Sequence, residues 1–253
     1  MDRIVDPSLG SALLADHASR RRSGARLGSA VVAKLVEDIV GGEYEPGDTL
    51  PTEADLGEQF GVSRTVIRES VLLLQDKGLV RIIQGKGTLV LDPQSWNMID
   101  DVVLSAVVRH DETLGILEEL IVVRAALERE MAAAAAGRAT PAQLEQLSEA
   151  FSAMRRAAAD ADEFALADVR FHDVVMELSG NRLARAIVSS IHDKARATLR
   201  YRGSTSADMI TLTLAEHRAV LDAIGRRDPA AADHAMHTHI TSAWARRHPT
   251  PAG

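Results

Sequence analysis

Three histidines and one aspartate in the second half of the chain have the types and spacing of a metal site. Asp168 and His172 are four residues apart, so on a helix their side chains would lie on one face, one turn apart. His217 and His239 follow in two later segments. Three imidazoles and one carboxylate from three helices can bind a divalent metal and leave one or two coordination positions open. The alternative is that these residues are ordinary polar groups of a core or surface, as most histidines are.

A stretch of cations between residues 62 and 91 has the chemistry to bind a nucleic acid. Five cations lie there with two acids, although the whole chain has a net charge of −7. Arg64 and Arg68 are four residues apart and share a helical face, and Lys86 lies between Gly85 and Gly87. A focused positive patch can bind phosphates, and the acidic remainder predicts strong salt sensitivity. The alternative is a set of solvated surface charges on a small domain.

Helix caps place these cations on a helix-turn-helix. Thr52 predicts the N-cap of a short helix over 52–60, and Ser63 predicts the N-cap of a second helix, with Gly61 and Val62 in the turn. Apolar residues of the second helix recur at i, i+4 and i+7, namely Ile67, Val71 and Leu74. They would pack inward and leave the arginines on an outward face.

A β-hairpin is predicted after the second helix. The runs 79–83 and 88–91 are rich in β-forming residues, and the sequence QGKG at 84–87 between them is typical of a glycine hairpin tip that carries a cation. Helix, turn, helix and hairpin together predict a winged helix-turn-helix, which is a module that reads DNA.

The rest of the chain has helical composition, rich in alanine, leucine, glutamate and arginine. Caps and breaks predict helices at 97–109, 112–137, 141–158, 161–178, 182–201, 207–225 and 229–246. Their natural assembly is an antiparallel bundle. The predicted fold is therefore mainly α: an N-terminal winged helix-turn-helix (α with a small β-wing) and a C-terminal all-α antiparallel helical bundle.

The domain limits follow from these patterns and from Pro93, which breaks the last strand. We expect a mobile N-terminal extension at 1–25, the winged helix-turn-helix at 26–92, a linker at 93–100, the helical domain at 101–247 and a tail at 248–253. The extension contains an arginine cluster at 20–22, which is either an arm that follows the DNA backbone or a solvated tail. The junction at 92–101 is the expected route between the domains.

Composition limits where the protein acts. The chain has no cysteine, which removes disulfides, thiolate metal sites and cysteine nucleophiles. It contains no apolar run of 18 residues and no secretory signal pattern, so no membrane span is expected. A cytoplasmic location fits these features.

The N-terminal domain resembles the GntR-type bacterial transcription regulators. The matching segments are GEYEPGD at 42–48, LPTE at 50–53, GVSRT at 61–65, Arg68-Glu69 and GLV at 78–80. The resemblance implies a homodimer that binds double-stranded operator DNA, one winged domain on each half-site. It implies DNA contacts from the second helix and the wing tip, that is from Arg64, Thr65, Arg68, Gly85 and Lys86. Ala54 departs from the pattern, because some relatives have an arginine there, so one operator contact is missing or replaced.

The C-terminal domain resembles the FCD effector domain of FadR-like GntR regulators. Four blocks occur in the same order: DVRFH at 168–172, SGN at 179–181, EHRAVLDAI at 216–224 and MHTH at 236–239. The resemblance implies that Asp168, His172, His217 and His239 hold a divalent metal that helps to bind the carboxylate of a small acid. Zinc is the expected ion, with nickel or manganese as alternatives.

Two further residues are candidates for binding the effector. Arg124 matches an arginine that often faces the effector in this family, and a guanidinium fits a carboxylate; the alternative is a salt bridge on the helix surface. Asn181 either contacts the effector or simply ends a helix. Glu128 is expected to pair with a nearby arginine. Of the other histidines, His192 is either pocket-lining or structural, and two are expected on a helix surface, His234 and His237.

We therefore predict a ligand-responsive DNA-binding transcription regulator, most simply a repressor of a catabolic operon, with a small organic or sugar acid as effector. The segment 95–104 resembles the domain junction of sugar-acid sensors and favours an aldonate or uronate. One alternative is a regulator that senses the metal itself. Another is a metal-dependent hydrolase fused to a DNA-binding domain, although the chain has no HExxH motif, nucleophile elbow or phosphate loop.

Overall fold

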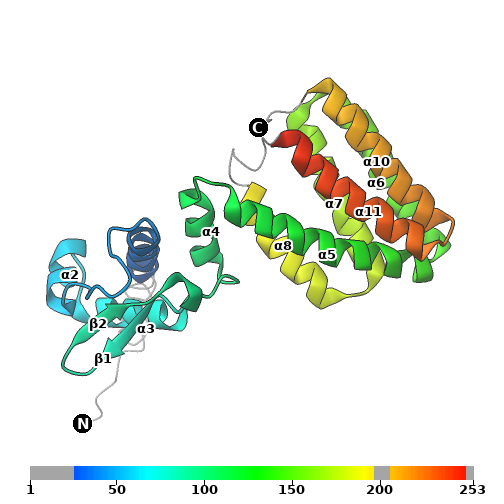
Figure 1. The fold of residues 1–253 in the computed structure, drawn as a ribbon. Helices are drawn as coiled ribbons and strands as arrows, with labels where there is room; N and C mark the ends of the chain where they lie inside the picture. Colours follow the sequence, from blue (N-terminus) through cyan, green and yellow to red (C-terminus); the bar gives the residue numbers. More distant parts are fainter. Residues whose placement is uncertain (1–25, 197–205, 249–253) are drawn as a thin grey trace, which may run out of the picture. The chain divides into compact units, whose positions relative to one another are not determined.

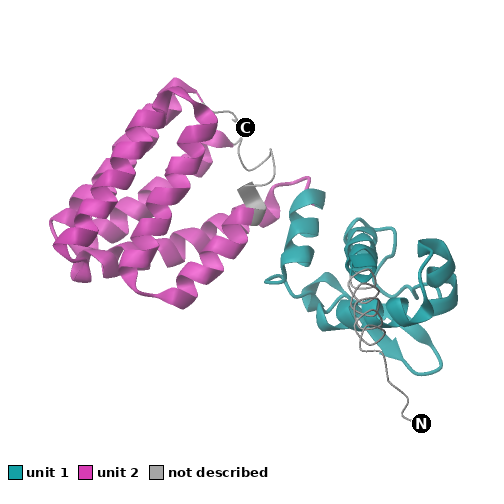
Figure 2. Cartoon of the chain, turned by 180° about the vertical axis from the view of Figure 1, so that it is seen from behind, with its two compact units in different colours: residues 1–110 teal, residues 111–253 magenta. Residues whose placement is uncertain are grey.

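The computed structural model describes residues 26–196 and 206–248 and shows a mainly helical protein with one small sheet (Figure 1). Contacts divide the chain into two compact units, residues 1–110 and residues 111–253 (Figure 2). The predicted fold class is confirmed. The arginine cluster at 20–22, the end of the predicted helix 182–201 and residues 249–253 lie outside the described residues.

The helix-turn-helix forms where the caps predicted it. After a first helix at 26–40, α2 (Glu53–Phe60) begins at Thr52, whose side chain forms a capping box with Asp55. Gly61 ends α2 in the left-handed conformation, with φ of 64°, which glycine adopts without steric cost. The Ser63 hydroxyl then accepts the backbone N–H of Val66 and starts α3 (Arg64–Asp76).

The wing is an antiparallel pair, β1 (Val80–Ile83) and β2 (Gly87–Val90), in which Val80 lies opposite Val90. Each strand is within one residue of the predicted run. Gly85 has φ of 75° and Gly87 has φ of 96°, so the tip uses backbone conformations that favour glycine. Ile67, Val71 and Leu74 of α3 are buried in the core of this unit.

The segment after the wing packs on the winged unit. A short turn η1 (Pro93–Ser95) leads to α4 (Asp101–His110), which begins four residues later than predicted. Val103 and Ala106 of α4 are part of the winged unit's core, and Glu37 pairs with both Arg109 and His110. Contacts therefore place the unit boundary after His110, whereas the sequence predicted a linker at 93–100. The difference arises because α4 buries its apolar face on this unit.

Unit 2 is a helical bundle. Its helices are α5 (Gly115–Arg138), α6 (Pro141–Arg156) with η2 (Ala157–Ala159), α7 (Ala161–Ser179), α8 (Arg182–Arg196), α10 (Ala207–Gly225) and α11 (Pro229–Arg247). Most begin at caps predicted from sequence, namely Thr140 with Gln143, Asp160, Ser206 and Asp228. The long helix α5 packs against α7, α8, α10 and α11 and lies at the centre of the contacts. No helix in the described ranges is long and apolar enough to cross a bilayer.

Helix α5 begins at Gly115, three residues after the start at residue 112 that the sequence predicted. The Asp111 carboxylate accepts backbone N–H groups of Thr113, Gly115 and Ile116, and Leu114 takes the left-handed conformation with φ of 64°. This conformation is costly for a branched residue. The connection between the units is therefore a folded turn, and α5 begins only after it.

Candidate metal and effector site

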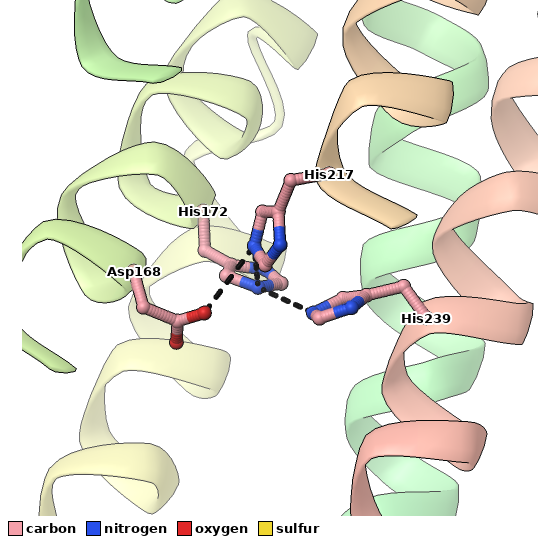
Figure 3. Close-up of side chains that lie close together, drawn as sticks. All are labelled: Asp168, His172, His217 and His239. Atoms are coloured by element: carbon pink, nitrogen blue, oxygen red, sulfur yellow. Dashed lines mark hydrogen bonds and ion pairs between the residues drawn. The ribbon is translucent and has the colours of Figure 1, made fainter. Parts of the chain in front are cut away.

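The four predicted ligands lie together in the interior of the bundle. Asp168 and His172 come from α7, His217 from α10 and His239 from α11 (Figure 3). One ligand atom of each lies within 4.8 Å of those of the others. The His172 Nε2 atom is 3.1 Å from His239 Nε2 and 3.3 Å from His217 Nε2, and Asp168 Oδ1 is 3.3 Å from His217 Nε2. All three histidines are buried.

The second ring nitrogen of each histidine, Nδ1, lies within hydrogen-bond distance of an oxygen atom outside the cluster. His172 Nδ1 is 2.5 Å from a carboxylate oxygen of Glu128, and His239 Nδ1 is 3.0 Å from one of Glu216. His217 Nδ1 is 2.8 Å from the backbone carbonyl oxygen of Thr213. Oxygen partners on the far nitrogen orient metal-bound histidines and increase their basicity.

These partners determine which nitrogen carries the proton. A backbone carbonyl only accepts hydrogen bonds, so His217 Nδ1 must donate. Burial lowers the pKa of His217 well below its ordinary value, which keeps the ring neutral and leaves a lone pair on Nε2. Burial also lowers the pKa of His239, whose Nδ1–H donates to Glu216. Glu128 in turn is ionised and accepts from His172 Nδ1.

The Nε2 atoms of three imidazoles and one carboxylate therefore face one another. Burial opposes ionisation of Asp168, but positive charge around it, on the imidazoles whenever they hold a second proton and on Arg247, holds the pKa of this carboxyl below its usual range. Neighbouring members of the cluster are 3.1–3.3 Å apart, close enough for one cation to contact all four. The donor set of three imidazole nitrogens and a carboxylate oxygen fits a divalent transition metal.

Arg124 is connected to this cluster through Glu128. Its Nε donates to Glu128 Oε1 at 2.7 Å, while Glu128 Oε2 faces His172. Both side chains are buried, so the pairing predicted for Glu128 is confirmed, and the surface salt bridge considered for Arg124 is wrong. Arg124 is thus a buried guanidinium beside the cluster, and its contact with a carboxylate ligand remains a prediction.

Asn181 lies two helical turns beyond His172, after the end of α7. Its side-chain oxygen accepts the backbone N–H of Ala184 and caps α8, as one of the two alternatives predicted. It also lines a surface hollow of about 710 Å³ together with Arg138 and Leu183. Its contact with an effector remains a prediction.

The predicted DNA-binding residues lie on the surface of the winged unit. Arg64, Thr65 and Arg68 are exposed on α3, and Gly85 and Lys86 are exposed at the wing tip. The buried face of α3 fixes their direction, because Ile67 and Leu74 have no exposed surface. Their contacts with DNA remain predictions.

The chain is similar to known families over both units. The family profile for the FCD domain matches residues 119–242, and that for bacterial regulatory proteins of the gntR family matches residues 27–90. The chain is 33% identical to the galactonate operon transcriptional repressor of Escherichia coli, over 85% of this chain and 94% of that protein. It belongs to the GntR family, in the group with an FCD domain.

Further relatives support the membership of this GntR regulator in the family. The HTH-type transcriptional repressor NanR of Cronobacter sakazakii is 33% identical, over 87% of this chain and 85% of that protein. A solved structure of Lar, which controls expression of the Listeria monocytogenes agr system, covers 87% of this chain and 95% of its own with a TM-score of 0.55. At 19% identity the Lar structure supports the fold alone. The relatives and domains are those of transcription regulators and not of enzymes, so the predicted hydrolase alternative is excluded.

Sequence reasoning missed several residues that support the site. Glu216 holds His239, and Arg246 binds both oxygens of Glu216 at 2.6 and 2.7 Å. Glu216 precedes His217 directly, yet it reaches the histidine of the next helix. Arg246 lies seven residues after His239, which places both residues on one face of α11. This spacing is the signal from which a role of Arg246 near the cluster could have been predicted. His234 and His237 are outside the cluster, as predicted.

Proposed function

We propose that this protein is a homodimeric repressor of a catabolic operon, and that its FCD domain binds a divalent metal and a small carboxylic or sugar acid. The convergence of three imidazole nitrogens and one carboxylate carries the proposal. Asp168, His172, His217 and His239 would hold the ion, with zinc expected before nickel or manganese. When bound, the metal supplies a positive charge with open positions for an acid oxygen.

The chain's own residues would orient the acid. Arg124 is buried beside the cluster, and its pairing with Glu128 fixes the direction of the guanidinium. A carboxylate that approaches His172 would therefore meet a cation with a planar row of donors. The similarity to a galactonate operon repressor and to NanR supports an acid from sugar metabolism.

The winged unit would place α3 in the major groove. Arg64, Thr65 and Arg68 would meet base edges or phosphates there, and Gly85 and Lys86 would contact the backbone next to the groove. Because one winged unit covers one half-site, a homodimer would match a short palindromic operator.

The direct test combines elemental analysis with calorimetry. Purified protein should contain about one divalent ion per chain, and a panel of sugar and hydroxy acids should yield at least one that binds it and releases operator DNA. Protein that binds operator but holds no metal, even after incubation with zinc, nickel or manganese, would contradict the proposed site.

A regulator that senses the metal alone is a second candidate. The observation that favours it is that the chain itself supplies all four ligand atoms, so an ion could be held without an acid. Operator affinity that depends on the metal and ignores every acid of the panel would support this second function.

A further inference from the structure

The segment after the wing lies directly against the C-terminal end of α3. This helix ends at the C-cap residue Lys77, and Gly78 follows in the left-handed conformation with φ of 76°. The backbone N–H of Asn97 donates to the carbonyl oxygen of Lys77 at 2.9 Å. A Cβ atom at Gly78 would lie 2.1 Å from the backbone oxygen of Ser95, so only glycine permits this approach. The end of α3 is therefore held by backbone contacts with residues that come after the wing.

An ion pair adds a side-chain connection at the same place. Lys77 Nζ donates to Asp100 Oδ2 at 2.5 Å, and both side chains are largely buried, with 15% and 23% of their surfaces exposed. The other carboxylate oxygen, Oδ1, accepts the backbone N–H groups of Val102 and Val103 at 3.0 and 3.1 Å and so caps α4. The carboxylate of Asp100 thus joins the last residue of α3 to the first turn of α4.

Helix α4 gives Asp100 a fixed position. Val103 and Ala106 are part of the winged unit's core, and the far end of α4 pairs with Glu37. The carboxylate of Asp100 is also ionised. Burial opposes this ionisation, but Lys77 and the two backbone N–H groups outweigh burial and hold the pKa of Asp100 below its ordinary value. A charged group on a fixed helix therefore restrains the end of α3.

The direction of α3 matters for the reading of a DNA sequence. Arg64 and Arg68 lie in the first half of this helix, and Lys77 lies at its end. A short helix moves as a stiff rod, so a tilt at one end changes where the side chains at the other end project. Bidentate pairing of an arginine with a base edge requires a defined geometry, whereas phosphate contacts carry no sequence information. A restraint on α3 should therefore affect selectivity between sequences more than general attraction to DNA.

We propose that Asp100 is a positioning residue for operator recognition, which together with Lys77 holds α3 in the orientation that lets Arg64 and Arg68 reach base edges. Asp100 acts through α3 and does not itself touch DNA, since its negative charge opposes DNA binding. This inference rests on the function proposed above and adds a residue outside the DNA-binding surface that sets sequence selectivity.

The test is a titration of the full-length protein with two labelled duplexes, followed by fluorescence anisotropy. One duplex is selected by the wild-type protein from a random-sequence pool, and the other has the same base composition in scrambled order. The ratio of the two affinities measures selectivity. Asp100→Asn removes the ion pair but keeps the start of α4, because asparagine caps a helix as well as aspartate does.

In Asp100→Asn the ratio should fall about 3–10-fold, because the selected duplex is bound more weakly while the scrambled duplex is bound at least as well as before. Loss of a negative charge alone would strengthen the binding of both duplexes. The direction of the change for the selected duplex therefore separates positioning from simple electrostatics.

Two further variants complete the test. Asp92→Asn is the matched control, because Asp92 caps the short turn η1 and has no ion pair within the described residues; its ratio should equal that of the wild type. Lys77→Met removes the other partner, so it should weaken both duplexes but lower the ratio as Asp100→Asn does. The double variant should have a ratio no lower than that of either single variant, because both substitutions remove the same interaction.

The outcomes separate this inference from the proposed function. A wild-type ratio in folded Asp100→Asn or folded Lys77→Met would overturn the role of the pair and leave the proposed function standing. Additive losses in the double variant would overturn it as well. Loss of folding in both single variants, measured by circular dichroism, would make the pair a structural one and also contradict the positioning role. Wild-type protein that selects no duplex from the pool contradicts the proposed function itself.

Discussion

The three histidines of the cluster use their two ring nitrogens differently. Nδ1 donates to an oxygen of Glu128, Glu216 or Thr213, and Nε2 faces the other ligands. The oxygen partners belong to α5 and α10, so folding of the bundle sets each tautomer before any ion arrives. A preset tautomer lowers the cost of ordering a metal site.

His217→Ala and His239→Ala should each remove the bound divalent metal, because each deletes one of the four ligands. Elemental analysis of purified protein measures this directly. His237→Ala, on the same helix as His239 but outside the cluster, is the matched control and should keep the ion. Full metal content in both ligand variants would show that the ion is held elsewhere.

Acid should destabilise the metal-free protein. The pKa values of His217 and His239 are lowered by burial, so the unfolded chain binds protons that the folded chain does not, and stability falls as the pH drops below about 6.5. The lowered pKa values of Glu128 and Asp168 act in the same direction below about pH 4.5, where the unfolded carboxylates take up protons. Urea unfolding of chelator-treated protein across pH 4–8 measures the change. A stability that is flat between pH 7 and pH 5 would contradict buried neutral histidines.

Glu128→Gln should be strongly destabilising, by about 3–5 kcal/mol in the free energy of unfolding, because it removes the negative charge that pairs with the buried Arg124. It should also weaken metal binding by about 10–100-fold, since Glu128 orients His172. Glu149→Gln breaks the exposed pair with Arg156 and should change stability little. Equal effects of the two substitutions in denaturant titrations would refute the buried-pair account.

At the scale of the helices, local sequence signals predicted where most helices begin. They did not predict which helices pack against one another. Thr52, Ser63, Thr140 and Asp160 cap helices because a side-chain oxygen satisfies first-turn N–H groups, which is a property of a few neighbouring residues. The start of α5 was missed because Leu114 adopts a conformation that its side chain disfavours. The turn is held locally by the Asp111 carboxylate, but the branched side chain of Leu114 gives no sign in the sequence that this residue enters the left-handed region.

The clustering of the four candidate ligands could be predicted because they combine helical spacing with family blocks, whereas the residues behind them could not. Glu128, Glu216 and Arg246 reach the cluster only after α5, α10 and α11 have packed together. The position of α4 was missed for the same reason, since Val103 could have packed on either domain as far as the sequence shows.

On α3 and the wing, two kinds of substitution should have different effects on DNA binding. Arg64→Ala or Arg68→Ala should cost about 1–3 kcal/mol of operator binding and relax the preference at one base position, if the arginine reads a base edge. Lys86→Ala at the wing tip should weaken all sequences similarly and reduce the salt slope by about one unit. Footprinting and salt titrations measure both effects. Binding unchanged by all three substitutions would place the DNA surface elsewhere.

In the whole molecule, the boundary between the units limits how a signal can pass. The sequence suggested the junction at 92–101, but α4 is fastened to the winged unit by Val103, by Ala106 and by the pairing of Arg109 and His110 with Glu37. The covalent connection that leaves this unit is the turn from Asp111 to Leu114. If an acid at Arg124 rearranges α5, we expect this turn to be affected, because the chain joins α5 to α4 there.

Effector binding can change operator affinity only if the acid binds the DNA-competent and DNA-incompetent dimers unequally. A coupling of about 1–3 kcal/mol is ordinary for such a switch, and linkage requires that operator DNA change the affinity for the acid by the same factor. Calorimetry of the acid with free protein and with the protein–operator complex should therefore give affinities that differ about 5–150-fold. Asp111→Ala should reduce this ratio while leaving the affinities of the free protein for the acid and for the metal nearly unchanged, because it removes the carboxylate that holds the turn and touches neither site. Equal affinities in the free and operator-bound wild-type protein would mean that the acid does not control DNA binding.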